Sequence, residues 1–349
     1  MDAAAQQEWP AVSVIMPVRD EERHLREAVA RVLGQVYPGE LEIVLAVGPS
    51  RDRTSEIAAE LAERNSQVRI VPNPAGHTPH GLNAAVAAAR YGIVVRVDGH
   101  GLLSPGYVRR AVELLAETGA ANVGGIMQAE GETDFERAVA RAMTSPFGIG
   151  GARFHLGGKA GPADTVYLGV FRRDVLERLG GYDEHFLRAQ DWELNYRIRQ
   201  AGGIVWFSPD LVVTYRPRRA LGALARQFFR AGQWRREVVR RHPDSASPRY
   251  LAAPLVTAAV GAGTLAGLAA VAGAPGWLAL GGLVPAAYTA GVVVAALVDG
   301  RGLPQSSRAW LPIVLAAMHL SWGSGFVVGP KRSAPEPVAT ERAERWTIR

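Results

Sequence analysis

The chain has 349 residues, and its 39 lysines and arginines exceed its 33 aspartates and glutamates, which gives a formal net charge of +6. It contains no cysteine, so disulfides and thiolate metal sites are excluded. The sequence contains no nucleic-acid recognition motif, and its basic residues are not interleaved with aromatic residues that could stack on bases. We therefore expect no nucleic-acid partner.

Strands and helices are expected to alternate along residues 12–118. Apolar runs bounded by turn residues predict the strands, and helical periodicity predicts the segments between them. Such alternation is typical of βαβ units, so we expect an α/β fold with a mostly parallel sheet. Neither G-x-G-x-x-G nor G-x-x-x-x-G-K-[ST] occurs, which argues against a dinucleotide-binding or P-loop enzyme. The expected strands are 12–18, 40–47, 68–71 and 93–98, and the expected helices are 19–33, 54–65, 81–90 and 107–118.

The fourth expected strand ends in Asp98-Gly99-His100. Ligands of open α/β sheets bind beyond the carboxyl ends of the strands. Because Asp98 and His100 are two residues apart, their side chains point the same way in an extended chain, and such a pair can hold a divalent metal against a diphosphate. Alternatively, Asp98 caps the next helix and His100 is an exposed loop residue. This segment alone leaves both interpretations open.

Residues 121–215 add two glycine-rich features and a second acidic segment. Gly124-Gly125 lie in a strand-like run, where the missing side chains suggest a close backbone approach. Residues 148–161 are expected to form either a mobile loop beside the site or a simple flexible connector. Asp191 begins a helix, and on its own it is most simply interpreted as a capping carboxylate. The expected strands are 121–128, 165–171, 204–207 and 211–215, and the expected helices are 135–143, 173–179 and 191–202.

The remainder of the chain has the pattern of a membrane anchor. Residues 220–242 predict an amphipathic basic helix that can lie in a membrane interface. Three nearly uncharged runs follow, each close to the roughly 20 residues that span a bilayer. Basic residues precede the first run, so the positive-inside rule places the globular part on the cytoplasmic face of a multi-pass cell-membrane protein. The expected organisation is a globular domain (1–219), an interfacial helix (220–245), a membrane domain (251–329, with spans 251–273, 276–298 and 310–329) and a polar tail (330–349).

Five segments, in their order and spacing, resemble family 2 glycosyltransferases with the GT-A fold, and most closely their membrane-anchored branch of ExoA type. Each segment alone is a weak signal, but the combination is specific. The opening segment resembles the family's P-x-x-N-E-E start, and Asp98-Gly99-His100 takes the place of its D-x-D motif. The segments are 14–22, 98–100, 164–184, 190–193 and 227–230.

Three departures from the family pattern bear on the site. The acidic pair that normally follows the second strand and contacts the base is replaced by Gly48-Pro49, which leaves the nucleotide open. The last D-x-D position is His100, and imidazole is a softer ligand than carboxylate, so Mn²⁺ is expected ahead of Mg²⁺. The tryptophan that follows Q-x-x-R in the family is Ala231 here, with Trp234 three residues on.

The resemblance implies an inverting sugar transfer from a nucleoside diphosphate sugar, with a UDP-sugar favoured. The implied acceptor is membrane-associated, a polyprenyl-linked or other saccharide used in polysaccharide or glycolipid synthesis. Asp191 is the implied general base, and Asp98 and His100 are the implied metal ligands. The expected substrate-binding residues are Pro17, Arg19, Glu21, Arg96, Asp98, Gln190, Glu193, Gln227, Arg230 and Arg235.

Two alternatives come from other functional classes. A nucleotidyltransferase built on a related fold would release pyrophosphate instead of a nucleoside diphosphate. A non-catalytic membrane scaffold that kept the fold would bind nucleotide sugars weakly or not at all.

Overall fold

The computed structural model describes residues 9–330, which divide into two compact units. The first unit contains residues 9–128 and 157–215, and the second contains residues 129–156 and 216–330. The expected boundary at residue 219 therefore differs from the observed division, because residues 129–156 belong with the carboxyl-terminal part of the chain. Of the predicted polar tail, all but Pro330 lies outside the described residues.

One mixed sheet organises the first unit. Within the described residues it has nine strands in the order β3-β2-β1-β4-β8-β6-β9-β5, with β7 paired to β9. The four strands β3, β2, β1 and β4 pair in parallel, whereas β8 is antiparallel to both β4 and β6. The strands are β1 (Val12–Val18), β2 (Leu41–Val47), β3 (Val68–Pro72), β4 (Ile93–Arg96), β5 (Leu102–Leu103), β6 (Asn122–Ala129), β7 (Gly161–Pro162), β8 (Tyr167–Arg172) and β9 (Val205–Tyr215).

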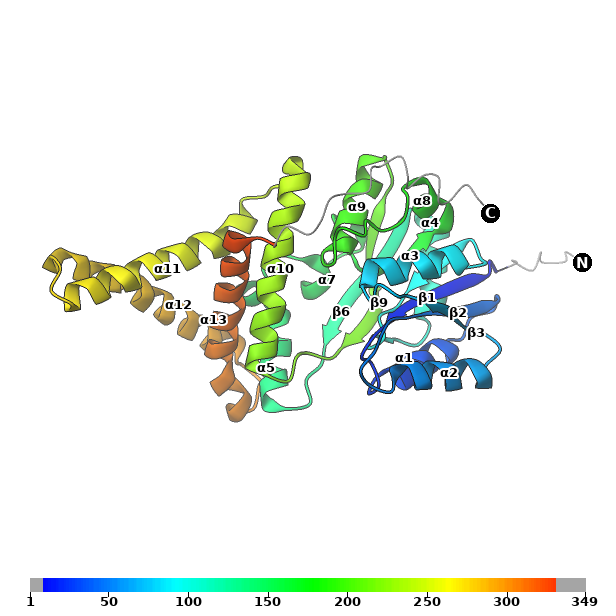
Figure 1. Ribbon diagram of the computed structural model, residues 1–349, viewed down its shortest axis with the longest axis horizontal. Coiled ribbons are helices and arrows are strands. Elements are labelled where there is room, and N and C mark those ends of the chain that lie inside the picture. The colour runs from blue at the N-terminus through cyan, green and yellow to red at the C-terminus, as the bar shows by residue number, and fades with distance from the viewer. Residues whose placement is uncertain (1–8, 331–349) are drawn as a thin grey trace, which may run out of the picture. The chain divides into compact units, whose positions relative to one another are not determined.

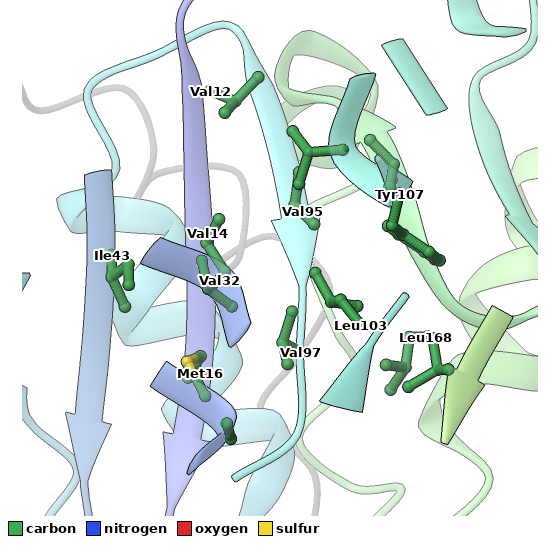
Figure 2. Close-up of a cluster of buried hydrophobic side chains, with 14 of the residues drawn as sticks. Val12, Val14, Met16, Val32, Ile43, Val95, Val97, Leu103, Tyr107 and Leu168 are labelled. Atoms are coloured by element: carbon green, nitrogen blue, oxygen red, sulfur yellow. The ribbon is translucent and has the colours of Figure 1, made fainter. Parts of the chain in front are cut away.

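Helices cover both faces of the parallel strands, which explains why β1 and β2 are apolar without alternation. Figure 1 shows α3 on one face and α1 and α2 on the other. Val14 and Met16 of β1, Ile43 of β2 and Val95 before the end of β4 are fully buried in the core that Figure 2 shows. The helices of this unit are α1 (Leu25–Leu33), α2 (Thr54–Arg64), α3 (Thr78–Ala88), α4 (Tyr107–Thr118), α8 (Arg173–Arg178) and α9 (Gln190–Gln200).

The predicted strands and helices are present, with several shifted limits. Helix α3 begins at Thr78, three residues before the predicted start, with Pro79 in its first turn, where proline is tolerated. The segments 204–207 and 211–215 form one strand, β9. Pro209 does not end this strand, since β7 pairs with residues before it and β5 with residues after it.

The two adjacent glycines of β6 lie where the sheet leaves no room for side chains. A Cβ on Gly124 would lie 2.7 Å from Val166 Cγ2, and one on Gly125 would lie 1.9 Å from the carbonyl oxygen of Leu211. The pairing of β6 with β8 also changes register between Val123 and Gly125. The predicted close backbone approach is confirmed.

The second unit is helical. Helix α13 runs beside α10 and also packs against α5, and the pair α11–α12 projects away from them (Figure 1). Three of its helical segments are long and apolar enough to cross a membrane, namely Tyr250–Val271, Gly276–Asp299 and Gln305–Val328. The elements are α5 (Asp134–Met143), α6 (Pro146–Ile149), α7 (Arg153–Leu156), α10 (Leu221–Arg241), η1 (Pro243–Ser245), α11 (Arg249–Val271), η2 (Gly276–Gly282), α12 (Leu283–Asp299) and α13 (Gln305–Val328).

Two predicted segments of this part differ in detail from the structure. The glycine-rich segment 148–161 was expected to be a loop, but short helices, α6 and α7, occupy part of it. Ser145 caps α6 by accepting a hydrogen bond from the Phe147 amide, and Pro146 follows at the first helical position. The third apolar run is longer than predicted, because α13 already begins at Gln305, directly after Pro304.

Candidate active site

A buried arginine lies at the point where β4 ends. Arg96 pairs in register with Ile15 of β1 and is only 2% exposed. Its Nε and Nη2 donate to Asp98 Oδ1 at 3.3 and 3.0 Å. A guanidinium at this depth requires charged partners, because an unpaired buried cation is very unfavourable.

The second partner of Arg96 comes from a distant part of the chain. Asp191, in the first turn of α9, forms an ion pair with Arg96 Nη1. The helix is preceded by Ala189 in the left-handed conformation (φ 61°), an uncommon state for a residue with a Cβ. The side chains of Asp98 and Asp191 remain 23% and 29% exposed. Two predicted site carboxylates therefore lie against one guanidinium, and both are partly open to solvent.

Local charges keep Asp98 ionised. Burial by itself would raise the pKa of Asp98, but the attraction of Arg96, His100 and Arg188 and the hydrogen bond from Arg96 outweigh it and lower this pKa. Burial would likewise lower the pKa of Arg96, whereas attraction to Asp98 raises it. The pair therefore stays charged at neutral pH.

Tyrosines enclose the same cluster. The Arg96 guanidinium carbon lies 5.8 Å from the centre of the Tyr182 ring, a cation–π distance. Burial raises the pKa of Tyr182 to about 12 and that of Tyr167 well above its usual value. Both phenols are thus neutral near pH 7 and surround the charged groups with low-dielectric material.

His100 is held by Glu21 from the loop after β1. His100 Nδ1 lies 2.7 Å from Glu21 Oε1, and the His100 ring meets Tyr215 edge-on with centroids 5.9 Å apart. Gly99 makes this contact possible, because a Cβ there would lie 2.9 Å from Glu21 Cγ. Within residues 9–330, no three His, Asp or Glu side chains are grouped so that they could hold a metal by themselves.

The loops after β1 and β2 are tied together beside this cluster. Asp52 Oδ2 accepts from the Glu22 amide at 3.0 Å, and the Thr54 hydroxyl accepts from the Glu21 amide at 2.7 Å. Asp52 is the acidic residue that remains in the segment after the second strand, where Gly48-Pro49 replace the family's acidic pair. Its side chain joins the loops after β1 and β2.

Arg19 and Pro17 lie at the adjoining strand ends. Arg19 Nη1 donates to the Gly76 carbonyl at 3.1 Å, in the loop after β3. Pro17 lies beside Gly81 of α3, where a Cβ would come within 3.1 Å of Pro17 Cβ. Both residues are therefore at the carboxyl edge of the parallel strands, and their expected contact with the nucleotide stays a prediction.

Glu193 and Gln190 have different surroundings from Asp191. Glu193 is 1% exposed and forms a bidentate ion pair with Arg197, at 2.7 and 2.8 Å. Arg197 also donates to the carbonyls of Leu179 and Gly181, so this pair braces α9 against the preceding turn. Gln190 is buried at the first position of α9. These contacts favour a structural role for Glu193, although its predicted role in substrate binding stays a prediction.

The three residues expected from the Q-x-x-R region belong to the second unit, on α10. Gln227 Oε1 accepts from Arg218 Nε at 3.1 Å, Arg230 is exposed, and the Arg235 guanidinium lies 4.6 Å from the Tyr250 ring centre. Their expected contacts with substrate stay predictions.

Three residues near the cluster escaped prediction. Tyr182 lies within the Gly180-Gly181-Tyr182-Asp183 segment that carried the family resemblance, so its position in that motif could have indicated it. Arg188 precedes Gln190-Asp191 and contributes to the charge around Asp98. Tyr215, at the end of β9, gave no local signal, because only the antiparallel return of β9 brings it to His100.

Comparison with known proteins identifies a family model and related chains. Residues 13–180 match the model of the family described as Glycosyl transferase family 2. The succinoglycan biosynthesis protein ExoA of Rhizobium meliloti (strain 1021) is 30% identical over 328 residues, which cover 90% of this chain and 93% of that protein.

A second relative and a solved structure are more distant. Dolichyl N-acetyl-alpha-D-glucosaminyl phosphate 3-beta-D-2,3-diacetamido-2,3-dideoxy-beta-D-glucuronosyltransferase of Methanococcus voltae is 22% identical over 239 residues, covering 66% of this chain and 74% of that protein. The mannosyltransferase PcManGT of Pyrobaculum calidifontis, solved with GDP-Man and Mn²⁺, has 22% identity and a TM-score of 0.57, and the match covers 92% of this chain and 87% of that one.

The fold of the mannosyltransferase confirms the predicted GT-A architecture, and the extent of the ExoA match decides the family. The region that matches the family model includes the strand end that carries Arg96, Asp98 and His100. The chain therefore belongs to glycosyl transferase family 2 and is a glycosyltransferase.

Proposed function

We propose that the protein transfers a sugar, with inversion, from a nucleoside diphosphate sugar to a membrane-associated acceptor, with Asp191 as the general base. The observation that carries this proposal is the arrangement of Asp98 and Asp191 around the single guanidinium of Arg96. In this proposal Asp98 serves the leaving group and Asp191 serves the attacking group, and the shared contact with Arg96 supports it.

Asp191 has the properties that the base requires. An inverting transfer requires a carboxylate that accepts the acceptor's hydroxyl proton as the oxygen attacks the anomeric carbon. Asp191 is 29% exposed, so an acceptor hydroxyl can reach it. A positioned base of this kind contributes roughly 10²–10⁴-fold to the rate.

Asp98 and His100 suit a divalent metal that the donor helps to bind. Asp98 is ionised, and the Glu21 carboxylate at His100 Nδ1 is the type of partner that orients a metal-binding imidazole. Two protein ligands are enough when diphosphate oxygens and water complete the coordination. A bound Mn²⁺ or Mg²⁺ supplies Lewis-acid stabilisation of the departing diphosphate, and we favour Mn²⁺ because of the imidazole.

The donor pocket is assigned to the carboxyl edge of the parallel strands. Pro17, Arg19 and Glu21 border it, and Gln190 lies beside the base. Arg230 and Arg235 of α10 would add charge-assisted contacts to phosphate oxygens. We favour a UDP-sugar, and the GDP-Man of the mannosyltransferase structure makes GDP-sugars the second class to test.

The acceptor is proposed to be lipid-linked, as in polysaccharide or glycolipid synthesis. The chain carries apolar helices that a soluble acceptor would not require. Its ExoA relative is named for succinoglycan biosynthesis, and its Methanococcus relative for transfer to a dolichyl-linked sugar phosphate. The proposed location of the catalytic unit is the cytoplasmic face of the cell membrane, and the basic residues of α10 support it through the positive-inside rule.

Two substitutions test the division of roles. Asp191→Asn is expected to abolish turnover and leave nucleotide–metal binding nearly unchanged, because the carboxamide keeps the shape but cannot take the proton. Asp98→Ala is expected to lose metal-dependent nucleotide binding. Calorimetric titration with UDP-, GDP- and dTDP-sugars, each with Mn²⁺ or Mg²⁺, measures binding, and release of the nucleoside diphosphate measures turnover.

Asp174→Asn is the matched control, since Asp174 lies on the exposed face of α8 in an i,i+4 pair with Arg178. It should leave both measurements unchanged. Near-wild-type turnover of Asp191→Asn would remove the base assignment, and unchanged affinity of Asp98→Ala in the presence of metal would remove the metal assignment.

A further inference from the structure

We propose that α13 does not cross the bilayer but lies along its surface together with α10, and that only the α11–α12 hairpin is inserted. The partner of this surface is a lipid bilayer, and the chain after α13 then remains on the side of the catalytic unit. The inference depends on the proposed membrane anchoring and is independent of the proposed chemistry.

Both ends of α13 are attached to polar side chains of α5 and α10. At its beginning, the Ser307 hydroxyl donates to Asp134 Oδ1 of α5 at 2.7 Å. At its end, Gln233 of α10 donates to the Gly329 carbonyl at 2.7 Å, and Arg236 donates to the carbonyls of Phe326 and Val327. These contacts satisfy terminal carbonyls that a helix leaves without an internal partner.

This attachment is incompatible with a crossing by α13. A helix of 24 residues is about 36 Å long, longer than the roughly 30 Å hydrocarbon core, so a crossing would place its two ends on opposite sides. Either Asp134 or Arg236 would then have to cross as well. Among the described residues, no candidate span precedes Tyr250, so α5 and α10 stay on one side of the membrane.

The middle of α13 is packed against protein along α10. Two glycines let the backbones touch: a Cβ on Gly232 of α10 would lie 2.0 Å from the Trp322 carbonyl oxygen, and one on Gly325 would lie 1.9 Å from the Phe229 carbonyl oxygen. Close glycine contacts of this kind join helices side by side. Of the residues in the most apolar stretch of α13, 33% are buried, compared with 11% in the corresponding stretch of α11. The exposed basic residues of α10, including Arg226 and Arg240, suit the headgroup region and not the hydrocarbon core.

The α11–α12 hairpin has the opposite character. Residues 250–298 contain no charged side chain, and large apolar groups such as Leu265, Val271 and Leu297 are 60% or more exposed. Helix α11 alone is about 34 Å long, enough to cross the hydrocarbon core. Trp277 near the tip is 69% exposed, and tryptophan is favoured at the membrane–water interface.

The hairpin returns to the side from which it started. Asp299, the last residue of α12, accepts a hydrogen bond from Ser145, and its carbonyl accepts one from Arg141 of α5 at 3.0 Å. The beginning of α11 follows α10 after the single turn η1. Two crossings therefore account for the membrane insertion of the second unit.

Single-cysteine labelling tests this topology directly, because the natural chain has no cysteine. Four full-length variants are reacted with a membrane-impermeant maleimide in inside-out and right-side-out vesicles. Arg51→Cys marks the catalytic unit, Gly276→Cys the hairpin tip, Arg301→Cys the turn between α12 and α13, and Arg349→Cys the chain end. Both Arg51 and Arg301 are exposed, and no atom lies within 4 Å of a Cβ at Gly276.

The expected result is labelling of Arg51→Cys, Arg301→Cys and Arg349→Cys only in inside-out vesicles, and of Gly276→Cys only in right-side-out vesicles. Labelling of Arg349→Cys only in right-side-out vesicles would show that α13 crosses and would overturn the inference. Failure of Gly276→Cys to react from outside would overturn the crossing by the hairpin. If the protein is absent from the vesicles altogether, the membrane anchoring itself is wrong, and sugar-transfer assays remain an independent measurement.

Discussion

At the scale of single residues, Arg96 is the group on which the candidate site depends. It is the largest fully buried charged side chain of the site, and it contacts the residue proposed to serve the leaving group and the residue proposed to accept the proton. Its planar guanidinium carries several N–H donors and can pair with two carboxylates at once, which a lysine ammonium on a flexible side chain does not do. We therefore assign Arg96 a positioning role in addition to the nucleotide contact that the sequence suggested.

Arg96→Lys is expected to lower kcat by about 10²-fold, since small misplacements of catalytic groups have effects of this size. The charge is retained, so the loss would reflect geometry and not simple neutralisation. Steady-state kinetics with the preferred donor and thermal unfolding of the same sample measure the effect. Arg69→Lys is the matched control, because Arg69 pairs with Glu42; equal losses in both variants would contradict a positioning role for Arg96.

The site residues differ in how far the sequence could predict them. Asp98 and Asp191 were predicted from their motifs, and the structure brings them together as expected. The bridge between them could not be predicted, because it joins β4 to a helix start almost a hundred residues later. The contact of His100 with Glu21 was equally hidden, since it depends on the loop after β1 and on the absence of a side chain at Gly99.

At the scale of the elements, the parallel strands were predictable because their runs are apolar on both faces. Glu42 is the exception within β2. It is 1% exposed and accepts hydrogen bonds from the Ser13 hydroxyl at 2.7 Å and from the Arg90 amide at 2.7 Å. Arg69 and Arg90 neutralise it from β3 and from the segment before β4. The Glu42 carboxylate thus joins β1, β2, β3 and the segment before β4. The apolar pattern of β2 does not reveal this role.

Glu42→Gln is expected to lower the free energy of unfolding by about 1–3 kcal/mol at neutral pH, the range for an impaired buried polar network. Burial would raise the pKa of Glu42, but hydrogen bonds from Arg90 and Ser13 and attraction to Arg69 and Arg90 lower it below its ordinary value of 4.5. A depressed carboxyl pKa stabilises the fold above pH 4.5, and this contribution is lost as the pH falls through the folded-state value. The difference between the two proteins should therefore shrink below pH 4.5. Chemical unfolding followed at several pH values measures it, and a constant difference down to pH 3 would exclude the charge as its origin.

The α10–α13 contact gives a second prediction at this scale. Gly325→Ala is expected to destabilise the second unit by about 1–3 kcal/mol, the usual effect of overpacking, because its Cβ would collide with the Phe229 carbonyl. Gly291→Ala on α12 is the control, since no atom lies within 4 Å of a Cβ there. Thermal unfolding of the full chain in detergent compares them; equal melting temperatures would mean that α10 and α13 are not in backbone contact.

At the scale of the whole molecule, the chain passes between the two units three times, after residues 128, 156 and 215. Residues 129–156 leave the first unit and contribute α5 to the second, and residues 157–215 return. The sequence could not indicate this exchange, because α5 has the same amphipathic pattern as a helix that covers a sheet. A cut at residue 219, the boundary that the sequence favoured, would separate α5 from α13. Phe135 of α5 packs against Trp310 of α13, with their ring centroids 5.4 Å apart.

A chain truncated after residue 219 is therefore expected to aggregate without detergent, because the buried Phe135, Val139 and Met143 of α5 lose their cover. Size-exclusion chromatography with and without detergent measures this. The full chain in detergent is the reference for a monodisperse particle. A monodisperse truncated protein in plain buffer would show that α5 is covered by the first unit.

The glycine contacts of α13 also carry a consequence for biosynthesis. The ribosome makes α13 after α10, α11 and α12, so Phe229 and Gly232 of α10 have no partner on α13 until the whole hairpin has been synthesised. If the hairpin inserts into the membrane as proposed, its insertion can therefore precede completion of the α10–α13 contact. A nascent polypeptide released early would be tethered to the lipid yet still lack its final support, which makes it a natural substrate for quality-control proteases.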